Sequence, residues 1–179
     1  MSDDETAPYK PGEGDLDKLQ ELQAQQAMTL DAQRPEAAAK RHAKGYRTAR
    51  ENLADLVDAD SFVEYGQLAV AAQRGRRSLE DLRQNTPADG IITGLATINA
   101  HQFGEEAAAC AVIVNDYSVL AGTQGFYHHL KLDRIIGVAG DKRLPVVMYT
   151  EGGGGRPGDT DVATQIAGLN ILSFRTWAA

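Results

Sequence analysis

Two apolar segments separated by a helix-length stretch constrain the fold of this chain most. Residues 107–115 (AAACAVIVN) are almost continuously apolar, and residues 144–150 (LPVVMYT) are similar. Such runs are typical of strands that are buried on both faces. Residues 126–141, which lie between them, carry apolar side chains at helical spacing. A strand, a helix and a second strand in this order predict a βαβ crossover, in which the two strands lie parallel in one sheet.

A run of four glycines, residues 152–155, follows the second of these strands. We expect a helix to begin near residue 160, so the run stands between a strand and a helix. Glycines in this place expose backbone N–H groups with no side chain in the way, as in an anion-binding nest or an oxyanion hole. The alternative is a flexible loop. A phosphate-binding P-loop is excluded, because Arg156 and Pro157 stand where that motif needs Lys and Ser or Thr.

A second glycine-containing loop follows the first apolar strand. Gly122, Gln124 and Gly125 come a few residues after Asn115 and Asp116. Open α/β sheets place ligands at the carboxyl ends of their strands. The loop is therefore either an ordinary strand-to-helix connection or a second wall of the crevice beside the glycine run.

The amino-terminal third of the chain is predicted to be helical. Residues 1–14 combine Pro, Gly and charges and are expected to form a disordered acidic lead-in. Helices are predicted over 15–33 and over 35–57, with Pro35 in the first turn of the second. On the second helix, basic residues recur every third position and form one basic side. That side is either a solvated surface or a contact for an anion, such as the phosphates of a nucleotide-like carrier. Its members are Arg41, Lys44, Arg47 and Arg50.

The stretch between the helices and the apolar strands contains weaker signals. Short strands are predicted over 62–65 and 91–98, a helical turn over 78–82, and a loop over 86–90. Residues 67–73 fit either a strand or a helix.

Composition excludes several classes of protein. The length of 179 residues is typical of one domain. The net charge is −7, and residues 1–34 hold eight acidic but three basic residues, which argues against general nucleic-acid binding. No apolar run approaches the roughly 18 residues of a membrane helix, and the acidic start is no secretory signal. With one cysteine an internal disulfide is excluded, so we expect a cytoplasmic protein.

No set of side chains predicts a metal centre or a nucleophilic triad. Cys110 lies within the apolar run and is expected in the core. His128 and His129 are adjacent on a predicted helix, where neighbouring side chains point about 100° apart and cannot chelate one metal. They are expected on the helix surface or in the core. His42 and His101 lack partners at ligand spacing, so a zinc site is not expected.

Four segments together resemble a known family. They are Thr48–Glu64 (TARENLADLVDADSFVE), Asp89–Gly94 (DGIITG), Val114–Gly125 (VNDYSVLAGTQG) and Leu144–Arg156 (LPVVMYTEGGGGR). In this order and spacing, from about residue 40 to 170, the chain resembles the carboxyltransferase component of biotin-dependent acyl-CoA carboxylases. The resemblance implies an α/β, crotonase-like fold of ββα units. Residues 58–179 would form part of the carboxyltransferase amino-terminal domain, preceded by a helical segment over 15–57.

The resemblance also implies the chemistry. In the family, carboxybiotin releases CO₂ in the site, the biotin ureido nitrogen takes the α-proton of an acyl-CoA, and the enolate attacks CO₂. Gly153 and Gly154 match the pair whose N–H groups bind the thioester carbonyl, and we predict them as the catalytic residues. The family usually has Ser and Ala where Gly152 and Gly155 stand. The predicted substrate-binding residues are Gly122, Gln124, Gly125, Gly152, Gly155, Arg47 and Arg50.

The family's component is longer and has a second homologous half that binds biotin. We therefore expect this chain to be an amino-terminal part that is inactive alone. The implied partners are biotin carboxylase, a biotin carrier and further copies of the full-length chain, with neither nucleic acid nor membrane. Two alternatives stay open. One is an acyl-CoA- or partner-binding half-domain without turnover, and the other is an enoyl-CoA hydratase or isomerase, for which Glu151 is the acidic candidate near the glycine pair.

Overall fold

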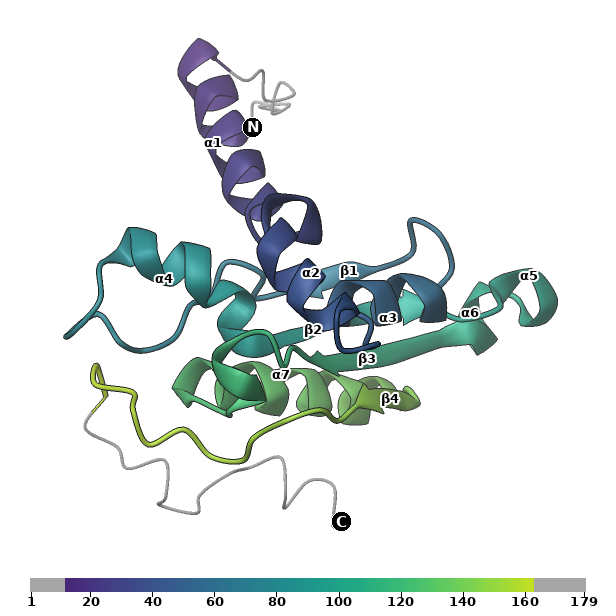
Figure 1. Cartoon of the computed structure of the whole chain (residues 1–179). Coiled ribbons are helices and arrows are strands. Elements are labelled where there is room, and N and C mark those ends of the chain that lie inside the picture. The colour runs from purple at the N-terminus through teal and green to yellow at the C-terminus, as the bar shows by residue number, and fades with distance from the viewer. Residues whose placement is uncertain (1–11, 163–179) are drawn as a thin grey trace.

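Four strands form one mixed sheet in the order β1–β2–β3–β4 in the computed structural model, which describes residues 12–162 (Figure 1). β1 pairs antiparallel with β2, β2 pairs antiparallel with β3, and β3 pairs parallel with β4. Helix α7, Phe126–Lys142, connects the two parallel strands, so the predicted crossover is confirmed. The strands are Val63–Tyr65 (β1), Ile91–Thr97 (β2), Ala109–Asn115 (β3) and Val146–Tyr149 (β4).

The central strand β3 is buried on both faces, as its continuous apolar run predicts. Ala111 and Ile113 face the apolar side of α7, where Ile135 is fully buried. Val112 and Val114 face the opposite side, where they pack in one cluster with Leu53 of helix α3, Ala49–Leu56. The alternation of β-strand side chains thus places one helix on each face of the sheet and builds three layers.

β4 is less buried than its sequence predicts. Val146 keeps 37% of its surface exposed, and the other three residues of the strand are half-buried. Of the described strands only β3 pairs with β4, which therefore lies at an edge of the sheet. The prediction of a strand buried on both faces is wrong here, because an apolar run does not tell whether a second neighbour covers the strand.

The predicted helix over 35–57 is two helices. α2 spans Pro35–His42, and α3 begins at Ala49. Gly45 between them has φ +75°, a conformation that glycine adopts readily and that ends a helix. Thr48 then caps α3, because its hydroxyl accepts the N–H of Glu51 at 3.0 Å.

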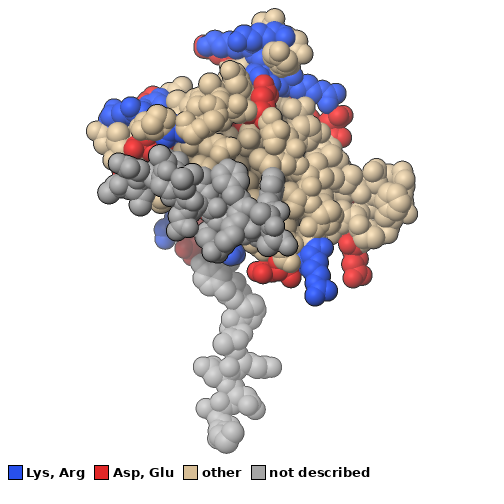
Figure 2. Space-filling model, turned by 90° about the horizontal axis from the view of Figure 1, so that it is seen from below, with Lys and Arg blue, Asp and Glu red and all other residues tan. Residues whose placement is uncertain are grey.

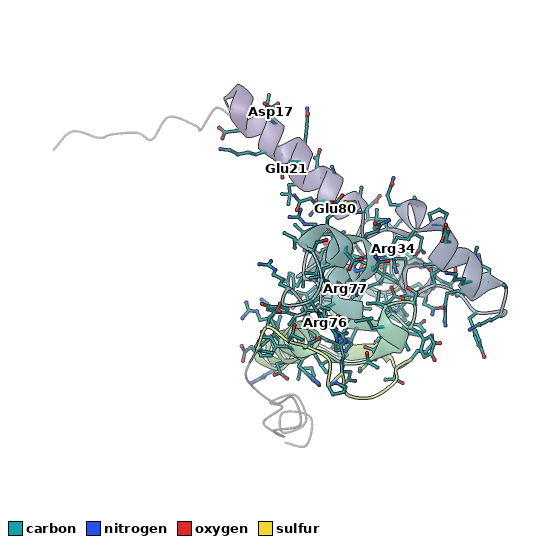
Figure 3. The ribbon with its side chains drawn as sticks, turned by 60° about the vertical axis from the view of Figure 1, so that its left-hand side comes forward. Asp17, Glu21, Arg34, Arg76, Arg77 and Glu80 are labelled. Carbon is teal, nitrogen blue, oxygen red and sulfur yellow. The ribbon has the colours of Figure 1, made fainter. Side chains whose placement is uncertain are left out.

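The predicted helix over 15–33 is also shorter. Helix α1 spans Glu13–Ala27, and a 3₁₀ turn, η1, covers Asp31–Gln33. α1 projects from the body of the protein and carries Asp17 and Glu21 away from the sheet (Figures 1 and 3).

The remaining elements are short. Residues 67–73 form neither strand nor helix, and the helical turn predicted over 78–82 is part of α4. Most of the predicted lead-in over 1–14, and nearly all of the helix expected from about residue 160, fall outside the described residues. The short elements are Leu79–Asn85 (α4), Pro87–Gly90 (η2), Ala100–Phe103 (α5), Glu105–Ala108 (α6) and Leu120–Gly122 (η3).

Where described residues are visible from below, their charged side chains lie mainly toward the outline of the molecule (Figure 2). None of the helices in the described part of the chain is both long and apolar enough to cross a membrane.

Candidate functional site

Two loops lie side by side at the carboxyl ends of the parallel strands. The glycine loop (residues 152–155) follows β4, and the β3 loop (residues 116–125) follows β3. Three backbone hydrogen bonds join them. Gly153 donates to Gly122 O at 3.2 Å, Gln124 donates to Gly154 O at 2.8 Å, and Arg156 donates to Gln124 O at 2.8 Å. The pairing extends the parallel sheet into both loops.

Close approach explains the glycine at position 122. A Cβ on Gly122 would lie 2.6 Å from Glu151 O, and its φ of +65° disfavours other residues. Gly154 differs, because it is exposed, has φ +83° and has open space where a Cβ would point. Among the described residues no backbone carbonyl accepts the Gly154 N–H, whereas the Gly153 N–H is taken by Gly122 O.

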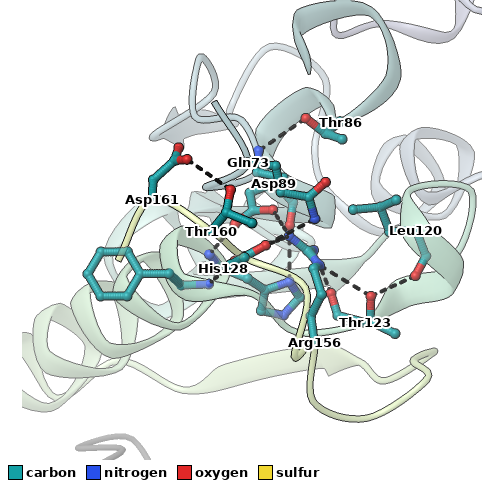
Figure 4. A network of polar contacts seen from close by, with 12 residues as sticks. Gln73, Thr86, Asp89, Leu120, Thr123, His128, Arg156, Thr160 and Asp161 are labelled. Carbon is teal, nitrogen blue, oxygen red and sulfur yellow. Dashed lines mark hydrogen bonds and ion pairs between the residues drawn. The ribbon is translucent and has the colours of Figure 1, made fainter. Parts of the chain in front are cut away.

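Arg156 anchors the carboxyl end of the glycine loop in the protein interior (Figure 4). Its Nη1 donates to Asp89 Oδ1 at 2.5 Å, and its Nη2 donates to Thr123 O at 2.6 Å. Asp89 is fully buried, and its Oδ2 accepts the backbone N–H of His128 at 2.8 Å. The network links η2, the β3 loop, the start of α7 and the glycine loop.

Burial dominates the electrostatics of this network. It raises the pKa of the Asp89 carboxyl, which Arg156 opposes by stabilising the anion. It lowers the pKa of His128 to about 3, so that imidazole is neutral at neutral pH. It also lowers the pKa of Lys131 to about 8, although the Lys131 ammonium donates to Ala88 O at 2.9 Å. Asp89, Arg156, His128 and Lys131 are all buried.

Cys110, His128 and His129 lie in the core, whereas His42 and His101 are exposed. Cys110 is 3% exposed, as predicted. His128 and His129 are buried on α7, which matches the core alternative rather than a surface pair.

A cavity of about 920 Å³ opens beside Glu151, the residue before the glycine loop. Its size is that of a site for a small molecule. Lys40 and Lys44 line it and are exposed, and neither makes an ion pair with a described residue. Other lining residues are Gln33, Arg34, Pro35, Glu36, Ala37, Arg41, Tyr46, Gln84, Asn85, Tyr117 and Ser118.

The predicted basic side does not exist as one surface, because the helix that would carry it is broken. Arg47 is exposed and pairs with Asp55 at 2.6 Å, away from the cavity. Arg50 is largely buried and pairs with Glu64 at 2.5 Å. Acidic side chains therefore neutralise both, whereas Lys44 remains at the cavity.

Sequence reasoning missed the arginines that hold the two loops. Arg34 donates to Asp116 at 3.2 Å, and Arg156 pairs with Asp89 across 67 residues. The position of Arg156 directly after the glycine run is the one local signal for its role. Nothing in the sequence pairs it with Asp89.

Residues 40–170 match the carboxyl transferase domain family. The chain belongs to that family. It is 31% identical over 140 residues to the propionyl-CoA carboxylase beta chain of Saccharopolyspora erythraea, and this match covers 78% of the chain and 24% of the relative. It is also 30% identical over 117 residues to the methylmalonyl-CoA decarboxylase alpha subunit of Veillonella parvula, covering 65% of the chain and 21% of the relative.

Solved structures confirm the predicted α/β, crotonase-like fold. A single-chain, multi-domain long-chain acyl-CoA carboxylase matches with TM-score 0.82 and 57% identity, over 90% of this chain and 16% of that one. The beta subunit of P. aeruginosa geranyl-CoA carboxylase matches with TM-score 0.59 and 25% identity, over 92% and 26%. This chain thus spans about a quarter or less of the length of these carboxyl transferase relatives.

Proposed function

We propose that this chain forms the thioester-binding part of a carboxyltransferase that moves a carboxyl group from carboxybiotin to the α-carbon of an acyl-CoA. The observation that carries the proposal is the exposed glycine loop, which is held against the β3 loop. It lies next to a cavity lined by two lysines that form no ion pair with any residue of the described range 12–162. Membership of the carboxyl transferase family supports it.

The glycine loop supplies the stabilising groups. A thioester that loses its α-proton develops negative charge on its oxygen, and fixed N–H donors stabilise that charge in a site with little water. In this proposal Gly153 and Gly154 are the donors. No backbone carbonyl within residues 12–162 accepts the Gly154 N–H, and Gly153 exchanges its 3.2 Å bond with Gly122 O for the thioester oxygen.

Biotin supplies the activated carboxyl group when it is bound as carboxybiotin on a carrier partner. A pair of backbone N–H donors suits a carbonyl oxygen, which both a thioester and the biotin ring carry. We assign the glycine loop to the thioester and assign none of the described residues to biotin.

Lys40 and Lys44 hold the CoA phosphates in this proposal. Both line the cavity and carry charges that no described acidic residue neutralises. The sequence-based candidates Arg47 and Arg50 already have the carboxylate partners Asp55 and Glu64.

The two alternatives predict different measurements. Glu151 as the acid or base of a hydratase or isomerase is disfavoured, because Arg41 engages both of its carboxylate oxygens. A binding half-domain without turnover has the same cavity and loop, so activity has to separate it from the carboxyltransferase. The proposal includes two partner proteins, biotin carboxylase and a biotin carrier. It also includes assembly of the full-length protein into a homo-oligomer and a cytoplasmic location.

The deciding experiment follows labelled bicarbonate in the full-length protein with ATP, its biotin carboxylase and carrier partners and an acyl-CoA. Label should reach the acyl-CoA, and Gly154→Val should lower kcat about 100-fold, the scale of one lost oxyanion donor. Binding of acyl-CoA with no transfer of label would establish the half-domain instead. Hydration of an enoyl-CoA would establish the enoyl-CoA hydratase alternative.

The phosphate assignment has its own test. Lys40→Gln with Lys44→Gln should raise the acyl-CoA KM, and the increase should shrink as salt rises. Lys142→Gln, an exposed lysine in the last turn of α7, is the matched control. An equal or larger increase in the acyl-CoA KM with Arg47→Gln would favour the sequence-based prediction that Arg47 binds the substrate.

A further inference from the structure

The amino-terminal helical segment reaches the loops at the carboxyl ends of both parallel strands. Arg34, which immediately precedes α2, donates to Asp116 at 3.2 Å and to Ser118 at 3.1 Å in the β3 loop. Figure 3 shows Arg34 at the base of the projecting helix, against the body of the protein. Arg41 at the other end of α2 reaches Glu151, next to the glycine loop. One short segment thus contacts both walls of the site.

Arg41 makes the more specific of the two contacts. Its Nη1 donates to Glu151 Oε1 at 2.8 Å and its Nη2 donates to Glu151 Oε2 at 2.6 Å, which is a bidentate pair. This geometry fixes the orientation of the carboxylate as well as its position. The two residues are 110 positions apart in the chain.

The Arg41 side chain makes further contacts that fix its own position. Its Nε donates to Arg47 O at 3.1 Å. Its guanidinium carbon lies 5.1 Å from the ring centre of Tyr46 and 5.8 Å from that of Tyr117, so cation–π contacts come from two segments. Arg41 is buried, whereas the Glu151 side chain keeps 42% of its surface exposed. The arginine is the fixed partner, and the glutamate is the one it holds.

Because Glu151 is held by Arg41, it also restrains the glycines that follow it. It immediately precedes Gly152, and its backbone oxygen lies against Gly122, where a Cβ would come within 2.6 Å. The position of the Glu151 main chain therefore sets how the glycine loop meets the β3 loop. A run of four glycines has little conformational preference of its own, so restraints at its two ends decide where its N–H groups point. Arg156 holds one end, and Glu151 stands at the other.

We propose that Arg41 is a positioning residue for carboxyl transfer, which acts through Glu151 to hold the glycine loop. The proposal rests on the proposed function for its effect on rate. Its effect on the loop does not, because the loop can be observed without turnover.

The first test measures the loop in the full-length protein. Hydrogen exchange of the peptide that covers residues 150–156 should be faster in Arg41→Gln and in Glu151→Gln than in the unchanged protein. Exchange in β3 should stay as it was. Arg77→Gln, which breaks the pair between Arg77 and Asp81 of α4, is the matched control and should leave the loop unchanged. Unchanged exchange in both test variants would overturn the proposal. Glu151→Gln alone decides the question if Arg41→Gln unfolds, because Glu151 is partly exposed.

The second test measures rate. Arg41→Gln and Glu151→Gln should each lower kcat about tenfold, and the double variant should be no slower than either, because both remove one interaction. Arg41→Lys should recover part of the loss by restoring the charge. Additive effects, or a rise in acyl-CoA KM alone, would mean that Arg41 contacts the ligand directly, and would overturn positioning through Glu151. If the unchanged protein transfers no carboxyl group, the proposed function fails, while the exchange result still decides the role of Arg41.

Discussion

At single positions of the site, the residue type is explained by close contact with neighbouring backbone or by the charge of its partner. Gly122 has a positive φ and lies against the Glu151 carbonyl, and Asp89 is fully buried beside Arg156. Arg41 makes cation–π contacts with Tyr46 and Tyr117. The backbone donors of the glycine loop need neighbours that fix the main chain, because a glycine has no side chain with which to fix itself.

At this scale we predict that Gly122→Ala destabilises the protein by about 1–3 kcal/mol, since the new Cβ combines a strained φ with a clash. Urea unfolding of the full-length protein measures it. Gly137→Ala is the control, because Gly137 lies within α7 and has nothing within 4 Å of its Cβ position. That variant should be neutral or stabilising by up to about 1 kcal/mol. Equal stability of the two variants would contradict the proposed packing of Gly122 against Glu151.

Among the secondary-structure elements, the break between α2 and α3 matters most for the site. The chain turns at Gly45, which has a positive φ, and Tyr46 packs against Arg41. The next helix then begins after the capping residue Thr48. A continuous helix over 35–57 could not place Arg41 and Tyr46 against each other in this way. The break therefore also shapes the wall of the cavity, because Arg41 and Tyr46 both line it.

Thr48→Ala should lower the free energy of unfolding by about 1–2 kcal/mol, the scale of a lost helix cap. The threonine hydroxyl accepts from Glu51 N at 3.0 Å and donates to Asp31 at 2.5 Å, so both bonds are lost. Thr150→Ala, at an exposed threonine just after β4, controls for the composition change. Chemical unfolding compares the two. A Thr48→Ala effect within about 0.5 kcal/mol of the control would show that the cap contributes little.

At the scale of the whole molecule, two helices cover the sheet and β4 stands at its edge. The strand exposes Val146, and α7 exposes Tyr127 and Leu130. Exposed strand edges with apolar side chains pair readily with other chains.

We predict that residues 1–179 made alone associate, and that Val146→Lys on the edge strand reduces this association. Light scattering across a concentration series measures it. Leu30→Lys adds the same charge at an apolar residue with similar exposure, 41%, away from the sheet edge. A compact monomer at all concentrations would refute the prediction, and equal effects of the two lysines would exclude the strand edge as the cause.

The sequence by itself determined the elements whose cause is local. A continuous apolar run predicts the doubly buried strand β3, and the spacing of Leu132, Ile135 and Ile136 predicts α7. Four glycines after a strand predict an exposed loop. The order of these elements is enough to predict the parallel crossover, and to predict that the loops after β3 and β4 meet at one end of the sheet. The break before α3 was also readable, in Gly45 and in the spacing of Thr48 and Glu51, although hydrophobic periodicity alone missed it.

Tertiary structure alone decided which charges meet. Arg41 pairs with Glu151, 110 positions away in the chain, and Arg156 pairs with Asp89, 67 positions away. Arg47 and Arg50, which the spacing placed with Arg41 on one side, turn to Asp55 and Glu64 instead. The physical reason is that an ion pair depends on the distance between two side chains after folding, and sequence spacing controls that distance only within one unbroken helix or strand. The burial of β4 and the route of the glycine loop were likewise settled by neighbours distant in the chain.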